Sequence, residues 1–323
     1  MRAATVRDGQ IVVEEHPDPT PGTGELLVRV WTAGLNGADM LQRKGAYPAP
    51  PGSPPDIPGL EFAGEVQGLG RDATRFAVGD RVMGIVGGGG QGERLVVHER
   101  QVMPVPQALD WTAAGGFSET FSTAHDALVT QAELRPGDRL LVHGAAGGVG
   151  TAAIQIGRAL GAHVTASARR EEHHDALREL GADVVLTPDA LADTDGARAA
   201  GAPARFDVAL ELVGAPDVEA DLRRLVAGGR IVVIGVGGGF KAQVNLVALM
   251  QSRARIMGST LRARPLEEKA AVARAVERGL LPLVERGALT VPIAAVHPLD
   301  DVAAAYDRFA AGGKLGKVVL DLG

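Results

Sequence analysis

The sequence predicts an α/β protein that combines a doubly wound parallel sheet with an irregular β-barrel. From about residue 119 to 255, apolar strand-like runs alternate with helical patterns, which is typical of a parallel sheet with crossover helices. Residues 1–118 instead contain short strand-like runs separated by Pro and Gly, and this rhythm indicates a small barrel. The third observation is a glycine-rich turn between the first strand and the first helix of the alternating region.

That turn predicts a binding site for a dinucleotide. An apolar run over residues 139–143 leads into Gly144, Gly147 and Gly150, and an alanine-rich helix and a second strand follow. Glycines at this spacing let the backbone turn sharply and approach a pyrophosphate, while the helix N-terminus offers unpaired N–H groups to the anion. We therefore expect a βαβ unit that binds a dinucleotide; a tight turn that binds nothing is the alternative.

Hydrophobic periodicity predicts the other main elements. In the first region we expect strands over residues 9–14, 25–31, 64–67, 79–83 and 93–98. In the alternating region we expect them over residues 140–143, 163–166, 183–186, 206–212 and 230–235. A helix over 266–277 and a strand over 316–321 come last. Because the stretch 256–323 is too short to stand alone, we expect it to complete the 1–118 domain, with the 119–255 domain inserted and the active site in the cleft between them.

Composition excludes several classes of function. The 323 residues carry a formal net charge of -6 and no basic block, so nucleic acid is not expected as the main partner. The chain has no Cys, which excludes disulfides, thiolate zinc ligands and thiol catalysis. It has neither an apolar run of membrane-spanning length nor the apolar core of a signal peptide, so we expect a soluble, cytoplasmic protein without a membrane partner.

Motifs along the whole chain point to a known family. They are LNGAD at 35–39, GAYP at 45–48, PGLEFAG at 58–64, VGDRV at 78–82, GDRLL at 137–141, AAGGVG at 145–150 and GKVVL at 316–320. With them the chain resembles the medium-chain dehydrogenase/reductase superfamily, and within it the zinc-independent quinone oxidoreductases related to zeta-crystallin. The resemblance implies a GroES-like catalytic domain, a Rossmann domain that binds NADP(H), and hydride transfer from NADPH to a quinone.

No metal site is expected. Zinc-dependent alcohol dehydrogenases of this superfamily carry Cys at the position of Asn36 and His at the position of Leu60, and this chain has neither. A catalytic zinc needs about three protein ligands. The eight His residues are scattered except for His173 and His174, which we interpret as solvated helix residues.

The end of the second strand predicts the choice of cofactor. Ser167 and Arg169 occupy the region where an NAD-preferring protein carries an acid for the ribose 2′-OH. A guanidinium can pair with the 2′-phosphate of NADP(H), so we expect NADP(H). Glu171 and Glu172 follow in the first turn of a helix, where acids are favoured anyway. The alternative is that the arginines form only a solvated face.

The resemblance also implies a set of site residues. Asn36 would lie near the nicotinamide and the substrate carbonyl, or would only order a loop. Tyr47, in a Pro-rich segment over 47–55 that could cover the cleft or be an ordinary surface loop, would line the quinone pocket or merely pack. Thr123 would contact the nicotinamide or brace a linker helix. The expected backbone contacts to the cofactor are Gly147, Gly148, Val149, Val213, Gly214, Gly235 and Val236. Close relatives carry Ser at the position of Gly147, so substrate preference is expected to differ.

Partners and alternative functions stay open at this stage. The segment over residues 253–258 resembles the edge strand through which superfamily members pair, so we expect a homodimer. An NADPH-dependent enone or enoyl-thioester reductase would share the fold and the hydride donor. A non-catalytic, crystallin-like protein that binds NADPH or RNA is the alternative from a different class.

Overall fold

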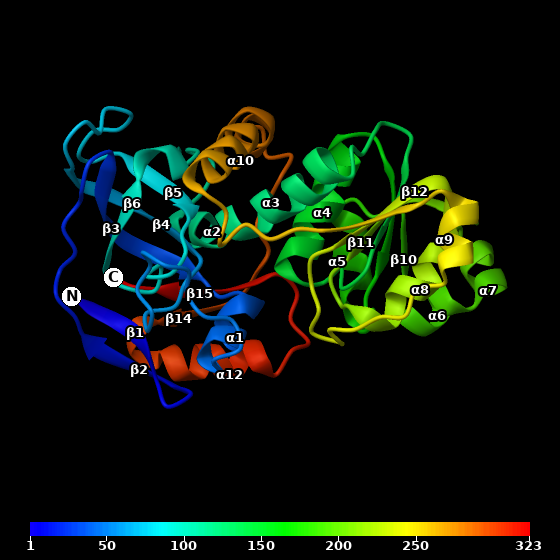
Figure 1. Cartoon of the computed structure of the whole chain (residues 1–323), viewed down its shortest axis with the longest axis horizontal. Helices are drawn as coiled ribbons and strands as arrows, with labels where there is room; N and C mark the ends of the chain where they lie inside the picture. The colour runs from blue at the N-terminus through cyan, green and yellow to red at the C-terminus, as the bar shows by residue number, and fades with distance from the viewer. The chain divides into compact units, whose positions relative to one another are not determined.

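The computed structural model describes residues 1–323, apart from the side chain of Ala215. The chain divides into two compact units. Unit 1 consists of Met1–Ser122 and Leu261–Gly323, and unit 2 consists of Thr123–Thr260. Figure 1 shows unit 1 in blue to cyan and orange to red, and unit 2 mainly in green and yellow. The predicted α/β class, a parallel Rossmann sheet plus a GroES-like β domain, is confirmed.

Unit 1 is built on β-strands. They are β1 (Arg2–Arg7), β2 (Gln10–Glu15), β3 (Glu25–Gly34), β4 (Glu61–Leu69), β5 (Arg81–Ile85), β6 (Arg94–His98), β7 (Val102–Pro104), β14 (Ile293–Pro298) and β15 (Lys317–Asp321). The strands β1 and β2 form a hairpin, and the others form a seven-stranded sheet in the order β14-β15-β3-β4-β5-β7, with β6 paired to β3. Its helices are α1 (Gly37–Arg43), η1 (Glu99–Gln101), α2 (Trp111–Gly115), α10 (Leu266–Gly279), α11 (Leu281–Glu285), η4 (Leu299–Asp301) and α12 (Val302–Ala310).

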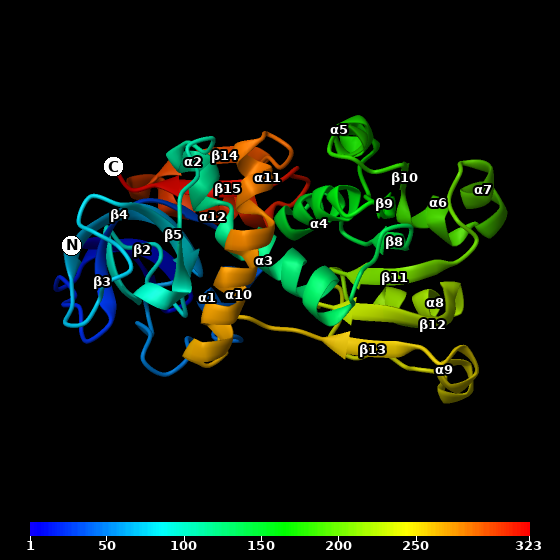
Figure 2. The same cartoon turned by 90° about the horizontal axis from the view of Figure 1, so that it is seen from above.

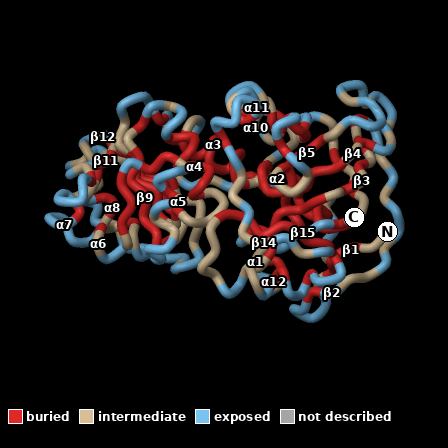
Figure 3. Tube along the Cα trace, turned by 180° about the vertical axis from the view of Figure 1, so that it is seen from behind, coloured by how far each residue is buried: buried red, intermediate tan, exposed pale blue. Residues whose placement is uncertain are grey.

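The core of unit 1 follows from strand alternation. Along β3, Leu26, Val28 and Val30 point to one face and are buried, as expected for a sheet with one face on a core. Val318 and Leu320 of β15 join the same apolar cluster, and Figure 3 shows β15 as buried. The C-terminal strand thus completes the core that the N-terminal strands begin.

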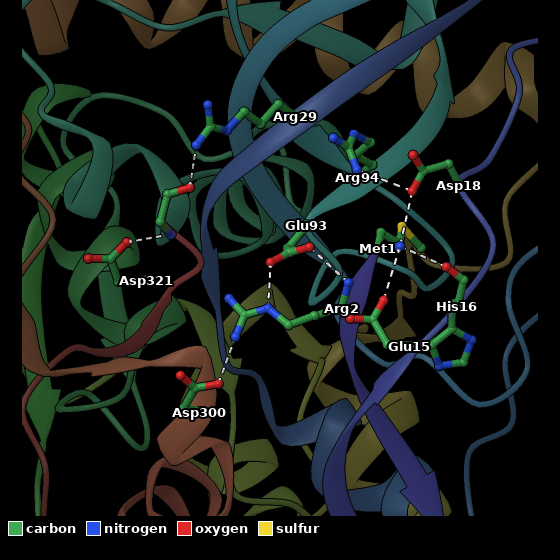
Figure 4. A network of polar contacts seen from close by, with 11 residues as sticks. Met1, Arg2, Glu15, His16, Asp18, Arg29, Glu93, Arg94, Asp300 and Asp321 are labelled. Atoms are coloured by element: carbon green, nitrogen blue, oxygen red, sulfur yellow. Dashed lines mark hydrogen bonds and ion pairs between the residues drawn. The ribbon is translucent and has the colours of Figure 1, made fainter.

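Polar contacts tie the first residues of the chain to this sheet (Figure 4). The amino group of Met1 donates to the carbonyl of His16 at 2.7 Å and lies 3.1 Å from a carboxylate oxygen of Asp18. Arg2 bonds Glu93 at 2.8 Å and Asp300 at 2.9 Å. Exposed ion pairs of this kind contribute little free energy, so their main effect is to fix the position of the β1–β2 hairpin.

Unit 2 contains a six-stranded parallel sheet. Its strands are β8 (Arg139–Val142), β9 (His163–Ser167), β10 (Val184–Leu186), β11 (Phe206–Glu211), β12 (Leu225–Val233) and β13 (Arg255–Gly258). Their order is β10-β9-β8-β11-β12-β13, which can be followed in Figure 2. The helices are η2 (Asp126–Gln131), α4 (Gly148–Ala159), η3 (Glu171–His173), α5 (His174–Glu179), α6 (Pro188–Ala192), α7 (Thr194–Ala199), α8 (Ala215–Arg224) and α9 (Leu246–Ser252), and α3 (Ser118–His125) contains the unit boundary.

The strand order defines where this sheet should bind a ligand. The chain moves outward from β8 through β9 to β10, and then returns to β11 and moves outward on the other side. The order therefore reverses between β8 and β11. In open α/β sheets, ligands bind at the carboxyl ends of the strands beside such a reversal.

A few elements differ from the sequence-based expectation. The strand β12 begins at Leu225 rather than at residue 230, because Gly228 and Gly229 lie in an irregularity of its pairing with β11 instead of in a turn. The strands β1 and β14 were not expected, since their sequences lack a clear apolar alternation. Among the described residues, every helix is too short or too polar to cross a lipid bilayer.

Candidate active site

The glycine turn holds the start of α4 at the carboxyl end of β8. Gly144 has a φ of 62°, a conformation that glycine adopts at little cost. A Cβ on Gly150 would lie 2.6 Å from Cα of Ala145, so the first turn of the helix packs directly on the backbone. The N–H groups of that first turn have no partner within the helix, and they lie where an anion would be bound.

Gly147, Gly148 and Val149 form the tip of this turn. Gly147 is the residue before the first turn of α4 and has a φ of -74°. A Cβ added to it would meet only the carbonyl oxygen of Gly144, at 3.5 Å. This is an ordinary contact, so the turn could accommodate the Ser that close relatives were expected to carry. Packing does not impose glycine at this position.

Ser167 and Arg169 lie beside the turn. Ser167 is the buried last residue of β9, and its carbonyl accepts a hydrogen bond of 3.0 Å from the N–H of Ala145. Arg169 follows two residues later and is exposed. The next residue, Arg170, forms an ion pair of 2.9 Å with Glu172. One of the two predicted guanidinium groups is therefore occupied by a neighbour, and Arg169 is the better candidate for an external phosphate.

The segments after β11 and β12 join the turn at the same edge of the sheet. A Cβ on Gly144 would touch the side chain of Val213 at 3.4 Å. Gly214 has a φ of 121°, and Gly235 packs so closely on the carbonyl of Leu212 that a side chain would collide with it. The structure thus brings together the backbone segments that carry the expected contacts Gly147, Gly148, Val149, Val213, Gly214, Gly235 and Val236.

A buried polar cluster that the sequence analysis did not identify lies at this edge. Glu211, the last residue of β11, accepts hydrogen bonds from the N–H groups of Val213 at 2.5 Å and of Gly214 at 2.7 Å. His143, which follows β8, has its Nε2 2.9 Å from a carboxylate oxygen of Asp221 on α8. Its Nδ1 lies 3.8 Å from Asp217 on the same helix. The sequence signal is a polar residue, His143 or Glu211, directly after a run of three apolar residues.

Burial, hydrogen bonds and neighbouring charges shift the pKa values of Glu211 and His143. Burial raises the pKa of Glu211 to about 6, against the opposing effects of His143 and the two N–H groups. Burial alone would lower the pKa of His143, but the hydrogen bond and charge of Asp221 outweigh it and raise that pKa overall. Both groups therefore hold their protons to a higher pH than they would in water.

In unit 1, Asn36 belongs to a different buried cluster. The Nζ of Lys317 donates to Oδ1 of Asn36 at 2.7 Å and lies 2.6 Å from a carboxylate oxygen of Glu61. The amide nitrogen of Asn36 donates to that same oxygen of Glu61 at 3.0 Å and to the carbonyl of Gly34 at 3.2 Å. Both ends of the Asn36 amide are thus engaged within unit 1.

Asp39 reinforces the position of Asn36. The carboxylate of Asp39 accepts the N–H of Asn36 at 2.8 Å and the N–H of Gly59 at 3.1 Å. Burial raises the pKa of this fully buried carboxyl to about 6, although the two N–H groups and the cations Lys317 and Arg262 act in the opposite direction. The loop that carries Asn36 is therefore fixed from both sides.

Tyr47 is held by Arg262. The guanidinium of Arg262 lies 5.0 Å from the centre of the Tyr47 ring, and its Nη1 donates to the Tyr47 carbonyl at 3.0 Å. Its Nε donates to the carbonyl of Gly87 at 2.8 Å, and the whole side chain is buried. Burial also raises the pKa of the half-buried Tyr47 phenol. The Pro-rich segment is thus tethered at its first residue, and Tyr47 stays protonated at neutral pH.

Thr123, the third candidate contact, is buried in α3 and is the first residue of unit 2. Asn36 and Tyr47 lie in unit 1. The three candidates thus belong to two separately described units.

The residues present do not match the superfamily's zinc site. Asn36 and Leu60 stand at the two ligand positions, and neither a carboxamide nor an alkyl group is a typical zinc ligand. One group among the described residues, His143, Glu211 and Asp217, offers ligand-type atoms within 4.8 Å of one another. Both N–H groups that Glu211 accepts bond to its Oε1, and its Oε2 has no hydrogen-bond partner among the described residues.

Comparison with known proteins agrees with the geometry. Residues 22–107 match the family model of the alcohol dehydrogenase GroES-like domain, and residues 148–277 match the model described as zinc-binding dehydrogenase. The quinone oxidoreductase of Homo sapiens is 31% identical over 304 residues, which cover 94% of this chain and 90% of that protein.

A solved structure and a larger enzyme are similar too. The quinone oxidoreductase from Thermus thermophilus, whose structure was also determined in complex with NADPH, is 34% identical, with a TM-score of 0.85 and full coverage of both chains. A stretch of the polyketide synthase GfsB from Streptomyces halstedii is 43% identical over 213 residues, which cover 66% of this chain and 4% of that protein.

Proposed function

Because the chain belongs to the quinone oxidoreductase branch of the medium-chain dehydrogenase/reductase superfamily, we propose that it is a metal-independent NADPH:quinone reductase. The observation that carries this proposal is the carboxyl edge of the unit 2 sheet. There the glycine turn meets the 213–214 segment beside the reversal of strand order, and the exposed Arg169 follows the end of the neighbouring strand β9. This is the expected position of a nicotinamide dinucleotide.

The residues present fit NADP(H). The first turn of α4, with Gly147, Gly148 and Val149, would hold the pyrophosphate. Arg169 would pair with the 2′-phosphate, and Ser167 would lie beside it. The backbone of Val213, Gly214, Gly235 and Val236 would contact the nicotinamide half. When bound, the cofactor supplies the hydride, and the protein supplies position, polarity and exclusion of water.

The chain's own groups would act on the acceptor. Tyr47 is proposed to donate its phenolic proton as a hydrogen bond to the quinone oxygen, where negative charge builds during reduction. Because Lys317 and Glu61 hold both ends of the Asn36 amide, we expect Asn36 to act chiefly by fixing the backbone near the acceptor. Thr123 is retained as a contact to the nicotinamide.

A second candidate is reduction of an activated double bond in an enone or enoyl thioester. The similarity to the polyketide synthase GfsB favours it, because such synthases extend acyl chains that are held as thioesters. This reaction needs the same hydride donor and differs in the acceptor. A non-catalytic NADPH-binding protein is the remaining alternative.

Turnover with matched acceptors separates these proposals. Loss of NADPH absorbance would be followed with phenanthrenequinone, cyclohexenone and crotonyl-coenzyme A at equal concentrations. The quinone should give the highest kcat/KM. A higher value for crotonyl-coenzyme A would assign the second candidate, and tight NADPH binding without any turnover would favour a binding protein.

We also propose a homodimer formed through β13. This strand is one of the two edges of the unit 2 sheet and has one unpaired side, which can accept a strand of a second copy. Exposed apolar side chains nearby in the sequence, at Phe240, Leu246, Val247 and Met250, support this proposal. Light scattering at micromolar concentration tests it, and a monomeric mass would exclude it.

A further inference from the structure

Glu211 links the two backbone segments that were assigned to the nicotinamide half. Its side chain accepts the N–H groups of Val213 at 2.5 Å and Gly214 at 2.7 Å. Its own carbonyl accepts the N–H of Gly235 at 3.1 Å and of Ile234 at 2.9 Å. One residue thus fixes the chain after β11 and the chain after β12.

The backbone conformation at Gly214 explains why the contacts from Glu211 are needed. Gly214 has a φ of 121° and leaves no room for a side chain, since a Cβ would lie 2.8 Å from the carbonyl oxygen of Gly239. Glycine is conformationally permissive, so the local sequence does not fix the direction of this peptide. The carboxylate of Glu211 supplies the missing constraint by accepting two adjacent N–H groups.

His143 is the nearest partner that can balance the charge of Glu211. The groups that face this site come from two elements besides β11. They are His143 at the end of β8, and Asp217 and Asp221 on α8, with Arg224 3.5 Å from Asp221. Glu211, Asp221 and His143 are all buried, so their charges are poorly screened by solvent.

We propose that Glu211 is a positioning residue for the dinucleotide, and that His143, held by Asp221, sets the charge on which this positioning depends. The inference rests on the proposed function, because it assumes that Val213 and Gly214 contact the cofactor. Charge-assisted hydrogen bonds are about twice as strong as neutral ones. Protonation of Glu211 therefore loosens the 213–214 segment, and cofactor affinity falls.

Titration with NADPH from pH 8 to 5.5 tests the proposal. The pKa of Glu211 is about 6, so the wild-type Kd should rise as pH falls through that value. In Glu211→Gln an acceptor oxygen remains but the charge is lost, so Kd should be raised about 5- to 10-fold at pH 8. The additional rise in Kd that the wild type shows at acid pH should be absent in Glu211→Gln. The cofactor's 2′-phosphate titrates in the same range, but it affects both proteins equally and cancels in their ratio.

Asp207 provides a matched control on the same strand. Its carboxylate accepts the N–H of Arg139 at 2.9 Å and the Nε of Arg139 at 2.8 Å, and it lies near the amino end of β11. Asp207→Asn removes the same charge far along the strand from the assigned segment. It should leave Kd at pH 8 and its pH dependence unchanged.

A second variant keeps the test informative if Glu211→Gln folds poorly. His143→Gln removes the cation that lowers the pKa of Glu211, so the midpoint of the Kd profile should move to higher pH. A purely structural role would not shift that midpoint.

The possible outcomes separate this inference from the proposed function. If the wild type binds NADPH but Glu211→Gln has the same Kd profile, or His143→Gln leaves the midpoint in place, the role of Glu211 is wrong and the proposed function stands. If the wild type binds neither NADPH nor NADH, both are wrong.

Discussion

Glu61 in unit 1 and Glu211 in unit 2 are both fully buried carboxylates, but they are balanced in different ways. Glu61 lies 2.6 Å from the ammonium of Lys317. Glu211 has the titratable His143 beside it, together with the acids Asp217 and Asp221. The difference teaches that the pair of Glu61 and Lys317 fixes a loop, whereas the charge of Glu211 depends on pH.

The largest expected effect comes from breaking the ion pair of Lys317 and Glu61. Lys317→Met removes the cation beside Glu61 and the donor to Oδ1 of Asn36, and removal of one partner of a buried pair costs about 3–5 kcal/mol of unfolding free energy. Both Trp residues, Trp31 and Trp111, lie in unit 1, so tryptophan fluorescence during urea unfolding reports this unit.

Two further variants sharpen that measurement. Adding Glu61→Gln to Lys317→Met removes the unpaired charge and should recover part of the loss. Arg100→Met breaks an exposed pair with Glu267 and should cost less than about 1 kcal/mol. A loss for Lys317→Met as small as that for Arg100→Met would show that the buried pair contributes little.

The next effect concerns Arg169, the exposed residue of unit 2 that is proposed to bind the 2′-phosphate. Arg169→Ala should weaken NADPH binding by about 10- to 100-fold, equivalent to about 1.5–3 kcal/mol for one charge-assisted phosphate contact. NADH lacks the 2′-phosphate, so its Kd should hardly change. Arg170→Ala is the matched control, because Arg170 is already paired with Glu172. A wild type that binds NADH as tightly as NADPH would refute the assignment of the cofactor.

The free energy of unfolding should depend on pH in both units, and this effect should be of intermediate size. The pKa values of Asp39 in unit 1 and Glu211 in unit 2 are raised to about 6, so the folded state holds these protons more tightly than the unfolded chain does. Their contribution to stability is greatest below the unfolded pKa values and is lost as pH rises through about 6. The loss should be about 3 kcal/mol for Asp39 and about 2 kcal/mol for Glu211.

Variants assign this loss to the two units. Asp39→Asn should remove the pH-dependent part of the change that is followed by tryptophan fluorescence. Glu211→Gln should leave that signal unchanged and alter the part of the far-UV circular dichroism transition that tryptophan fluorescence does not follow. If stability instead rises between pH 5 and 7 in the wild type, the sign of both shifts is wrong.

These contrasts indicate what the sequence could and could not reveal. The fold class was predictable because its signals are local: the glycine spacing from Gly144 to Gly150 and the alternation of strands and helices. The pair of Lys317 and Asn36 joins residues 281 positions apart, and Arg262 and Gln42 are 220 positions apart. Contacts between such distant residues leave no periodic pattern in the sequence. The motifs therefore identified these segments but not the residues that they contact.

Tyr47 provides a smaller effect that separates unit 1 from cofactor binding. If its phenol donates to the quinone oxygen, Tyr47→Phe should lower kcat/KM for a quinone by about 10-fold, equivalent to about 1.4 kcal/mol, with NADPH affinity unchanged. The packing alternative makes the opposite forecast, since Phe keeps the ring beneath Arg262. Steady-state kinetics with one ortho-quinone and a parallel NADPH titration decide between them.

The smallest expected effect is that of metal removal. Asn36 and Leu60 occupy the superfamily's zinc-ligand positions in a chain without Cys, and hydride transfer to a quinone can be assisted by a phenol instead of a Lewis acid. The remaining candidate is the group of His143, Glu211 and Asp217, where two backbone N–H groups already occupy Oε1 of Glu211. Dialysis against a strong chelator should therefore leave quinone turnover and NADPH affinity unchanged. Loss of turnover that added zinc restores would contradict this, and repeating the experiment with Asp217→Asn would show whether the metal occupies the buried cluster of unit 2.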